Sequence, residues 1–194
     1  MIINNLKLKR TLAQQVPSVI KRRIFNDLEK QFEQAKAKLL KDFENHAVTR
    51  ELNEKNGASN ISNTLGGEGN LYSFIGFSGE DALSQLRDLL ENGIKIISRR
   101  TDPGNLSFSI KISIPNENSI SAATPMPWAP GMSWAEGIEK GISGLGNYLN
   151  KKTSSSRSGS GIQIDFNIRN QTFSGVPYLT KILEDFIREL GKLK

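Results

Sequence analysis

Few residues of this 194-residue chain have side chains that could do chemistry. It contains no Cys and a single His, His46. The lack of Cys excludes a disulfide framework, a Cys-ligated zinc, an iron–sulfur cluster and a thiol nucleophile. One imidazole excludes any site that needs two. His46 follows a predicted helix, where a His more often contacts the last carbonyls than acts as a base. We therefore do not expect His46 to be catalytic.

Two further patterns contain residues that could form a catalytic or phosphate-binding site, but their neighbouring residues do not fit such a site. Glu136 and Glu139 could form an acid–base pair, but Glu136 already fits a capping box and Glu139 lies beside Lys140. Residues 66–69, GGEG, lack the G-K-[ST] ending of a phosphate-binding loop, and no predicted strand precedes them. Acidic residues do not show the spacing of a calcium loop. We therefore expect no enzyme activity, no cofactor and no metal site.

The charge of the chain is unevenly distributed. Residues 1–50 hold 11 Lys and Arg against 5 Asp and Glu, whereas residues 51–194 hold 15 of each kind. Lys21, Arg22 and Arg23 are the densest basic cluster. A basic segment favours an anionic partner such as nucleic acid, a membrane surface or an acidic protein face, although a solvated helix face has the same composition. No apolar run approaches the roughly 20 residues of a membrane span, so we expect no membrane partner.

A long helix is predicted from about residue 17 to residue 43. Pro17 suits the first turn, where its missing N–H would be unpaired anyway. One apolar stripe follows the helix at steps of three or four residues: Val16, Ile20, Ile24, Leu28, Phe32, Ala35, Leu39 and Phe43. Such a helix is roughly 40 Å long. We expect part of the stripe, including Ile24 and Leu28, to contact another subunit; the alternative is that it spans the back of its own sheet.

The remaining elements predict one α+β domain over residues 1–194. In order they are a long loop at 53–70, a helix from Ser78 to Gly93, strands at 94–100 and 106–114, a second long connection at 116–132, a helix from Ser133 to Leu149, a flexible linker at 151–161, a strand at 162–168 and a helix from Pro177. We expect a small antiparallel sheet of three or four strands covered by helices. Trp134 fits the core, and Trp128, in a Pro-rich loop, fits an interface anchor.

Three stretches carry a resemblance to a known family. They are residues 43–52 (FENHAVTREL), 69–77 (GNLYSFIGF) and 133–145 (SWAEGIEKGISGL). Together they resemble neck proteins of tailed bacteriophages, in the tail-completion and head–tail-joining group, over roughly residues 15–190. None of the three is a catalytic motif. The basic N-terminus and the linker at 151–161 do not correspond to features of that family.

The resemblance implies a structural virion protein. Such a protein would form a homo-oligomeric ring in the phage neck, between the portal or connector and the tail tube or tail terminator, and would assemble in the host cytoplasm. One alternative is a cytoplasmic nucleic-acid-binding protein that uses the basic N-terminal helix. Another is a virion-carried peptidoglycan hydrolase or nuclease, which the lack of Cys and the single His make a poor fit.

Genomic DNA passes along the axis of a phage neck, so the basic cluster could lie near it. A strongly cationic channel would hold DNA and slow its exit. We therefore expect Lys21, Arg22 and Arg23 to face an acidic surface of a neighbouring protein chain rather than DNA.

Overall fold

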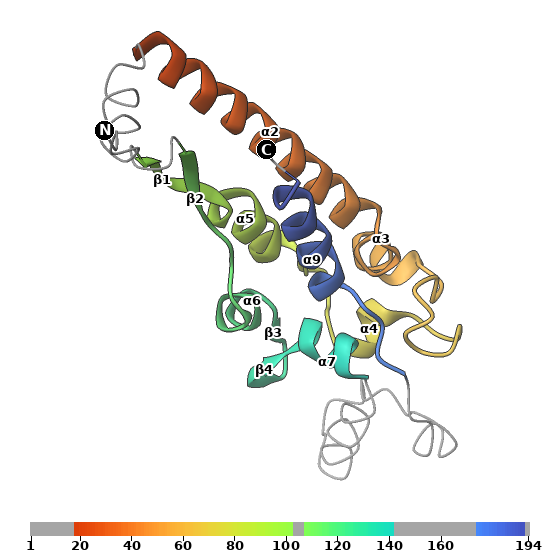
Figure 1. Cartoon of the computed structure of the whole chain (residues 1–194). Coiled ribbons are helices and arrows are strands. Elements are labelled where there is room, and N and C mark those ends of the chain that lie inside the picture. Colours follow the sequence, from red (N-terminus) through yellow and green to blue (C-terminus); the bar gives the residue numbers. More distant parts are fainter. Residues whose placement is uncertain (1–17, 103–106, 142–173, 193–194) are drawn as a thin grey trace, which may run out of the picture.

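The computed structural model describes residues 18–102, 107–141 and 174–192 (Figure 1). The predicted linker at 151–161 and the predicted strand at 162–168 lie outside these residues. The described chain is a mixture of helices and small antiparallel sheets with one long N-terminal helix. The predicted α+β class is therefore confirmed.

Helix α2 (Ser18–Asn45) is the long helix that the apolar stripe predicts. Its 28 residues span about 42 Å. The apolar stripe of its second half is buried at Phe32, Leu39 and Phe43, and α9 (Leu179–Leu190) lies along it (Figure 1). The rings of Phe32 and Phe186 meet edge to face at 6.4 Å between centroids. Near the beginning of α2, in contrast, Ile20 remains 49% exposed. The small domain thus covers only part of the stripe.

The strands form two separate two-stranded sheets. β1 (Lys95–Asp102) and β2 (Ser107–Ser113) form the predicted antiparallel hairpin, and the Phe108 ring of β2 meets Phe25 of α2 at 5.7 Å. β3 (Pro125–Met126) pairs with β4 (Ala129–Ser133). The described strands therefore do not join into one sheet of three or four strands, because β3 and β4 pair only with each other.

The segment 116–132 is more ordered than the predicted long connection. It contains α6 (Glu117–Ala123) as well as β3 and most of β4. Asn116 caps α6, since its Oδ1 accepts a hydrogen bond from the N–H of Ser119 at 2.8 Å. The three Pro residues that suggested a loop lie beyond this short helix, at 125, 127 and 130.

Three other helix boundaries differ from the prediction. The apolar patch after residue 70 is helix α4 (Leu71–Ile75), and α5 (Ser84–Gly93) begins six residues later than expected. Gly93 is the last residue of α5, as predicted, and its φ is not positive. Gly76, in contrast, ends α4 in the left-handed conformation, with φ of 95°. α7 (Trp134–Lys140) begins at the predicted cap Ser133 but ends before Gly141, whose φ is 94°.

The core lies where α2, α4, α5, α7 and α9 meet. Tyr178, just before α9, is buried at its centre and shares a 2.7 Å hydrogen bond with the hydroxyl of Thr49 in α3 (Ala47–Glu54). Burial raises the pKa of the Tyr178 hydroxyl, so it remains protonated. Within the part of the chain that is described, no helix is both long enough and apolar enough to cross a membrane.

Candidate functional site

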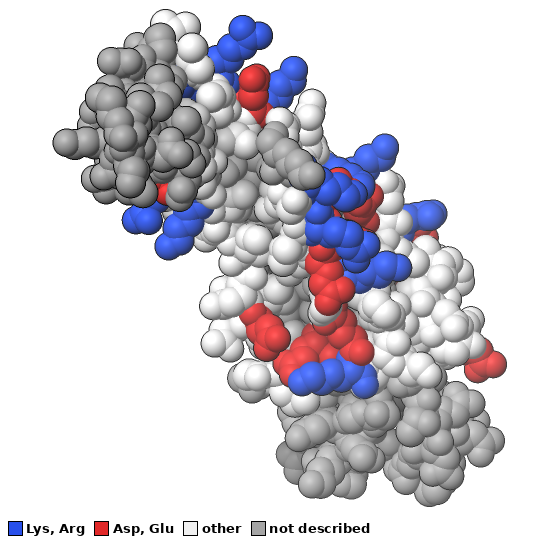
Figure 2. Space-filling view, in the orientation of Figure 1, with Lys and Arg blue, Asp and Glu red and all other residues white. Residues whose placement is uncertain are grey.

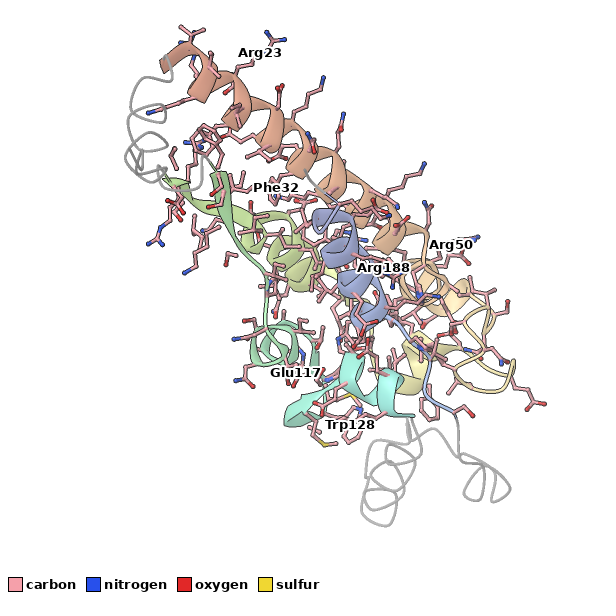
Figure 3. All side chains as sticks on the ribbon, viewed as in Figure 1. Arg23, Phe32, Arg50, Glu117, Trp128 and Arg188 are labelled. Carbon is pink, nitrogen blue, oxygen red and sulfur yellow. The ribbon has the colours of Figure 1, made fainter. Side chains whose placement is uncertain are left out.

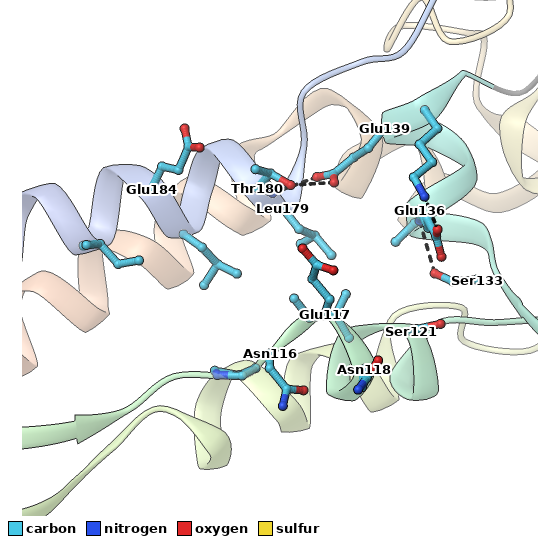
Figure 4. A pocket seen from close by; sticks show the side chains of 16 residues that line it. Asn116, Glu117, Asn118, Ser121, Ser133, Glu136, Glu139, Leu179, Thr180 and Glu184 are labelled. Carbon is cyan, nitrogen blue, oxygen red and sulfur yellow. Dashed lines mark hydrogen bonds and ion pairs between the residues drawn. The ribbon is translucent and has the colours of Figure 1, made fainter.

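A groove of about 960 Å³ lies between α6, α7 and α9 (Figure 4). Its apolar lining, called its floor below, consists of Pro115, Ile120, Ala135, Leu179, Leu183 and Ile187. Four carboxylates line it as well: Glu117, Glu136, Glu139 and Glu184. Lys140 is the one basic side chain among the lining residues. We call this cavity the acidic groove.

Glu139 fixes the position of α7 relative to α9. Its two carboxylate oxygens accept hydrogen bonds from the backbone N–H and the hydroxyl of Thr180, at 2.7 and 2.6 Å (Figure 4). Thr180 lies in the first turn of α9, and the preceding Tyr178 makes no side-chain cap. Glu139 therefore caps α9 from 41 positions away in the sequence. This contact holds the two walls of the acidic groove together.

Glu136 is also engaged within its own helix. Its carboxylate pairs with Lys140 one turn later, and that hydrogen bond and charge raise the pKa of Lys140. Its backbone N–H donates to the Ser133 hydroxyl at 3.1 Å, which forms the predicted N-cap. Glu136 and Glu139 therefore hold different partners, Lys140 and Thr180.

The two other carboxylates of the acidic groove are less engaged, although the charge of Glu117 adds to the raised pKa of Lys140. Glu117 and Glu184 are exposed, and neither forms an ion pair with any residue in the described ranges. Glu117 projects from α6 toward α9 (Figure 4). An apolar floor beside free negative charge suits the binding of a segment that is both apolar and basic.

A second polar cluster surrounds Glu51, which is completely buried in α3. Its Oε1 accepts hydrogen bonds from the backbone N–H of Leu71 and from Nδ2 of Asn60, both at 2.9 Å. Its Oε2 accepts from the N–H and the hydroxyl of Ser62, at 3.1 and 2.6 Å. This cluster organises the loop at 53–70, and no buried side-chain N or O atom of the described residues lacks a partner. We therefore assign the cluster a structural role.

His46 forms the junction between α2 and α3. Its Nδ1 accepts a hydrogen bond from the N–H of Val48 at 3.3 Å, which caps α3, and its ring lies 4.8 Å from that of Tyr178. Burial lowers the pKa of His46, the carbonyl of Pro177 opposes that effect, and Lys181 adds slightly to the lowering. His46 is therefore a neutral cap, and no metal-binding group of three or more His, Asp or Glu is found in the described chain.

Because the cap needs neutral His46, we predict that His46 lowers the free energy of unfolding at acidic pH relative to neutral pH. Its pKa in the folded chain is below the ordinary value of 6.5, so the unfolded chain binds the proton more readily. The contribution of His46 is constant well above pH 6.5 and decreases as the pH falls below that value. His46→Asn keeps an acceptor for the cap but does not titrate. Between pH 7.5 and pH 5.5, the free energy of unfolding in urea should decrease more for the parent than for His46→Asn. Equal decreases would contradict this role of His46.

The structure separates the residues predicted to form interfaces. Lys21, Arg22, Arg23, Ile24 and Leu28 all lie in the first half of α2; Arg22 and Arg23 are exposed, and the other three are half-buried. Trp128 lies at the other end of the molecule from Arg23 (Figure 3).

Trp128 is half-buried against its own chain. Its Nε1 donates to the carbonyl of Ile75 at 2.6 Å, and its ring lies so close to Gly76 that a Cβ there would be 2.8 Å from it. This contact and the positive φ together require Gly at position 76. The role of Trp128 as an interface anchor stays a prediction.

Sequence reasoning missed the acidic groove. Asn116 followed by Glu117 is a recognisable helix start, and this signal could have revealed α6. No sequence signal links Glu139 to Thr180 or Glu117 to α9, since those segments meet only in the fold.

The chain was also compared with models of protein families, with curated proteins and with solved structures. None of the three comparisons finds a match.

Proposed function

We propose that the chain is a structural virion protein that forms a ring in the neck of a tailed bacteriophage, where it joins the head or connector to the tail. The observation that carries the proposal is that the three stretches resembling phage neck proteins pack against one another. Leu71, in the second stretch, donates its N–H to Glu51 in the first at 2.9 Å. Phe77, also in the second, meets Trp134 of the third at 6.4 Å between ring centroids. The resemblance thus involves one contiguous core rather than three scattered matches.

Two other features support a scaffold rather than an enzyme. Glu136 and Glu139, the two carboxylates whose spacing suggested an acid–base pair, are engaged in an ion pair and a helix cap. The chain also presents two different surfaces, the exposed beginning of α2 and the acidic groove. A ring needs such contacts, because each copy must use one surface toward the preceding copy and another toward the next.

The alternative of a nucleic-acid-binding protein is supported by the exposed side chains of Arg22 and Arg23. No Phe, Tyr or Trp lies between residues 18 and 24, so the stacking platforms common in single-strand binding are missing from this basic cluster. We therefore regard the cluster as a protein contact.

The native mass of the purified full-length chain tests the proposal. We expect a discrete ring by native mass spectrometry, with a central opening visible in electron microscopy images. A monomer that binds duplex DNA with an affinity falling steeply between 50 and 200 mM salt, roughly 10³–10⁵-fold for 6–10 phosphate contacts, would instead support the nucleic-acid alternative and overturn the ring.

A further inference from the structure

The beginning of α2 carries an apolar and basic surface that the described fold does not cover. Val19 is 65% exposed and Ile20 is 49% exposed. Lys21, Arg22 and Arg23 follow, and none of them forms an ion pair with another residue of the described ranges. In the sequence, residues 1–26 contain six Lys and Arg and no Asp or Glu. We call residues 19–23 the basic end of α2.

Helical spacing puts the two kinds of side chain of the basic end on one face. Ile20 and Arg23 are three residues apart, and Val19 and Arg23 are four apart, so they are neighbours on the helix surface. Any surface that receives this face must offer an apolar contact and a negative charge side by side.

The acidic groove has that combination. Ile187 on its floor is 52% exposed, and Glu117 and Glu184 on its walls are exposed and have no ion-pair partner within the described chain. Figure 2 shows acidic side chains gathered in the lower half of the molecule, in the region of α6 and α7, whereas basic side chains lie near the upper end, where α2 begins, and in a band across the middle.

The two surfaces cannot meet within one molecule. Arg23 lies at one end of the molecule and Glu117 toward the other (Figure 3), and the rigid length of α2 separates its beginning from the elements that pack on its second half. Within the described residues, neither surface therefore has a partner in its own molecule.

We propose that the basic end of α2 of one copy docks into the acidic groove of the next copy, head to tail. The inference rests on the proposed ring and names the contact that closes it. Burial of Val19 and Ile20 against the apolar floor provides the affinity. The pairs between Arg22 or Arg23 and Glu117 or Glu184 contribute little each, and set orientation and partner choice.

Charge reversal on each surface of the full-length chain tests this contact. The end variant combines Arg22→Glu and Arg23→Glu. The groove variant is Glu184→Lys. Glu117→Lys is made as a second, separate groove variant, so that one remains if the other disturbs its helix. Lys41→Glu with Arg50→Glu is the control for the end variant, because both residues are exposed on α2 or α3 and the change in net charge is the same. Circular dichroism melting identifies any variant that is not folded.

We expect the end and groove variants each to weaken self-association at least tenfold in sedimentation velocity, and the control to leave it unchanged. An equimolar mixture of end and groove variants should recover association, because each reversed surface then finds a complementary one on the other variant. The parent assembly should also dissociate more readily at high salt.

The outcomes separate the two proposals. Variants that are folded and associate as well as the parent overturn the docking contact and leave the ring proposal standing. Loss of association in both variants without recovery in the mixture also overturns the contact. A parent chain that stays monomeric overturns the ring, and the docking contact with it.

Discussion

Glu51→Gln should lower the free energy of unfolding by at least about 2 kcal/mol, although Gln has almost the same shape as Glu. Each carboxylate oxygen of Glu51 accepts at least two hydrogen bonds from donors that are themselves buried. In either orientation of the Gln amide, its NH₂ group would face N–H or O–H groups of Leu71, Ser62 or Asn60. A buried donor without an acceptor costs about 1–3 kcal/mol, and here at least two lose theirs.

Glu54→Gln is the matched control, because Glu54 lies in the same helix and is exposed. We expect its effect to stay within about 0.5 kcal/mol. Chemical denaturation of both variants at neutral pH measures the difference. Equal stability of the two variants would mean that the Glu51 cluster does not hold the loop at 53–70 to α3.

Trp134→Ala should cost about 3–5 kcal/mol, the usual range for removing a large aromatic ring from a core. Trp134 is 1% exposed. Its ring lies 6.4 Å from that of Phe77 and 6.5 Å from that of Tyr178, so it connects α7 to the segment just after α4 and to the residue just before α9. Its removal leaves a cavity where the second and third stretches that resemble phage neck proteins meet.

Ile187→Ala is the control for this truncation, because Ile187 is 52% exposed and its loss opens no cavity. We expect a change within about 0.5 kcal/mol, measured by far-ultraviolet circular dichroism in urea so that the loss of Trp fluorescence does not interfere. If Trp134→Ala were as mild as Ile187→Ala, the core would have to be centred elsewhere. A ring that still forms from folded Trp134→Ala protein would show that this core is distinct from the interface.

The elements with a strong local signal were predictable from the sequence. The repeated spacing of apolar residues identified α2 to within two residues at its C-terminal end, and the alternation around Ile110 together with the turn at residues 102–105 identified the β1–β2 hairpin. The cap at Ser133 was correct for the same reason, since a cap depends on residues only three positions apart. Periodicity and capping depend on residues that are close in the sequence, so they can be recognised without the tertiary structure.

Weaker local signals led to errors in the short elements. The pattern Ser78-x-x-Asp81 suggested a helix start, but Asp81 instead accepts a hydrogen bond from Leu83 before α5 begins at Ser84. Three Pro residues suggested an irregular connection over 116–132 and concealed α6. Short helices of this kind depend on packing as much as on propensity, so local sequence alone does not determine their limits.

The sequence by itself determined that this chain is an α+β protein with an amphipathic helix too long for one small domain, and with its basic excess at the N-terminal side. Only the tertiary structure decided where the acidic groove lies, because Glu117, Glu139 and Glu184 come from three helices far apart in the chain. Tertiary packing also decided that Glu51 is buried and Glu54 is not, although both belong to α3. The physical reason is that burial and the pairing of charges depend on which surfaces come together, and that is a property of the packed chain rather than of any local pattern.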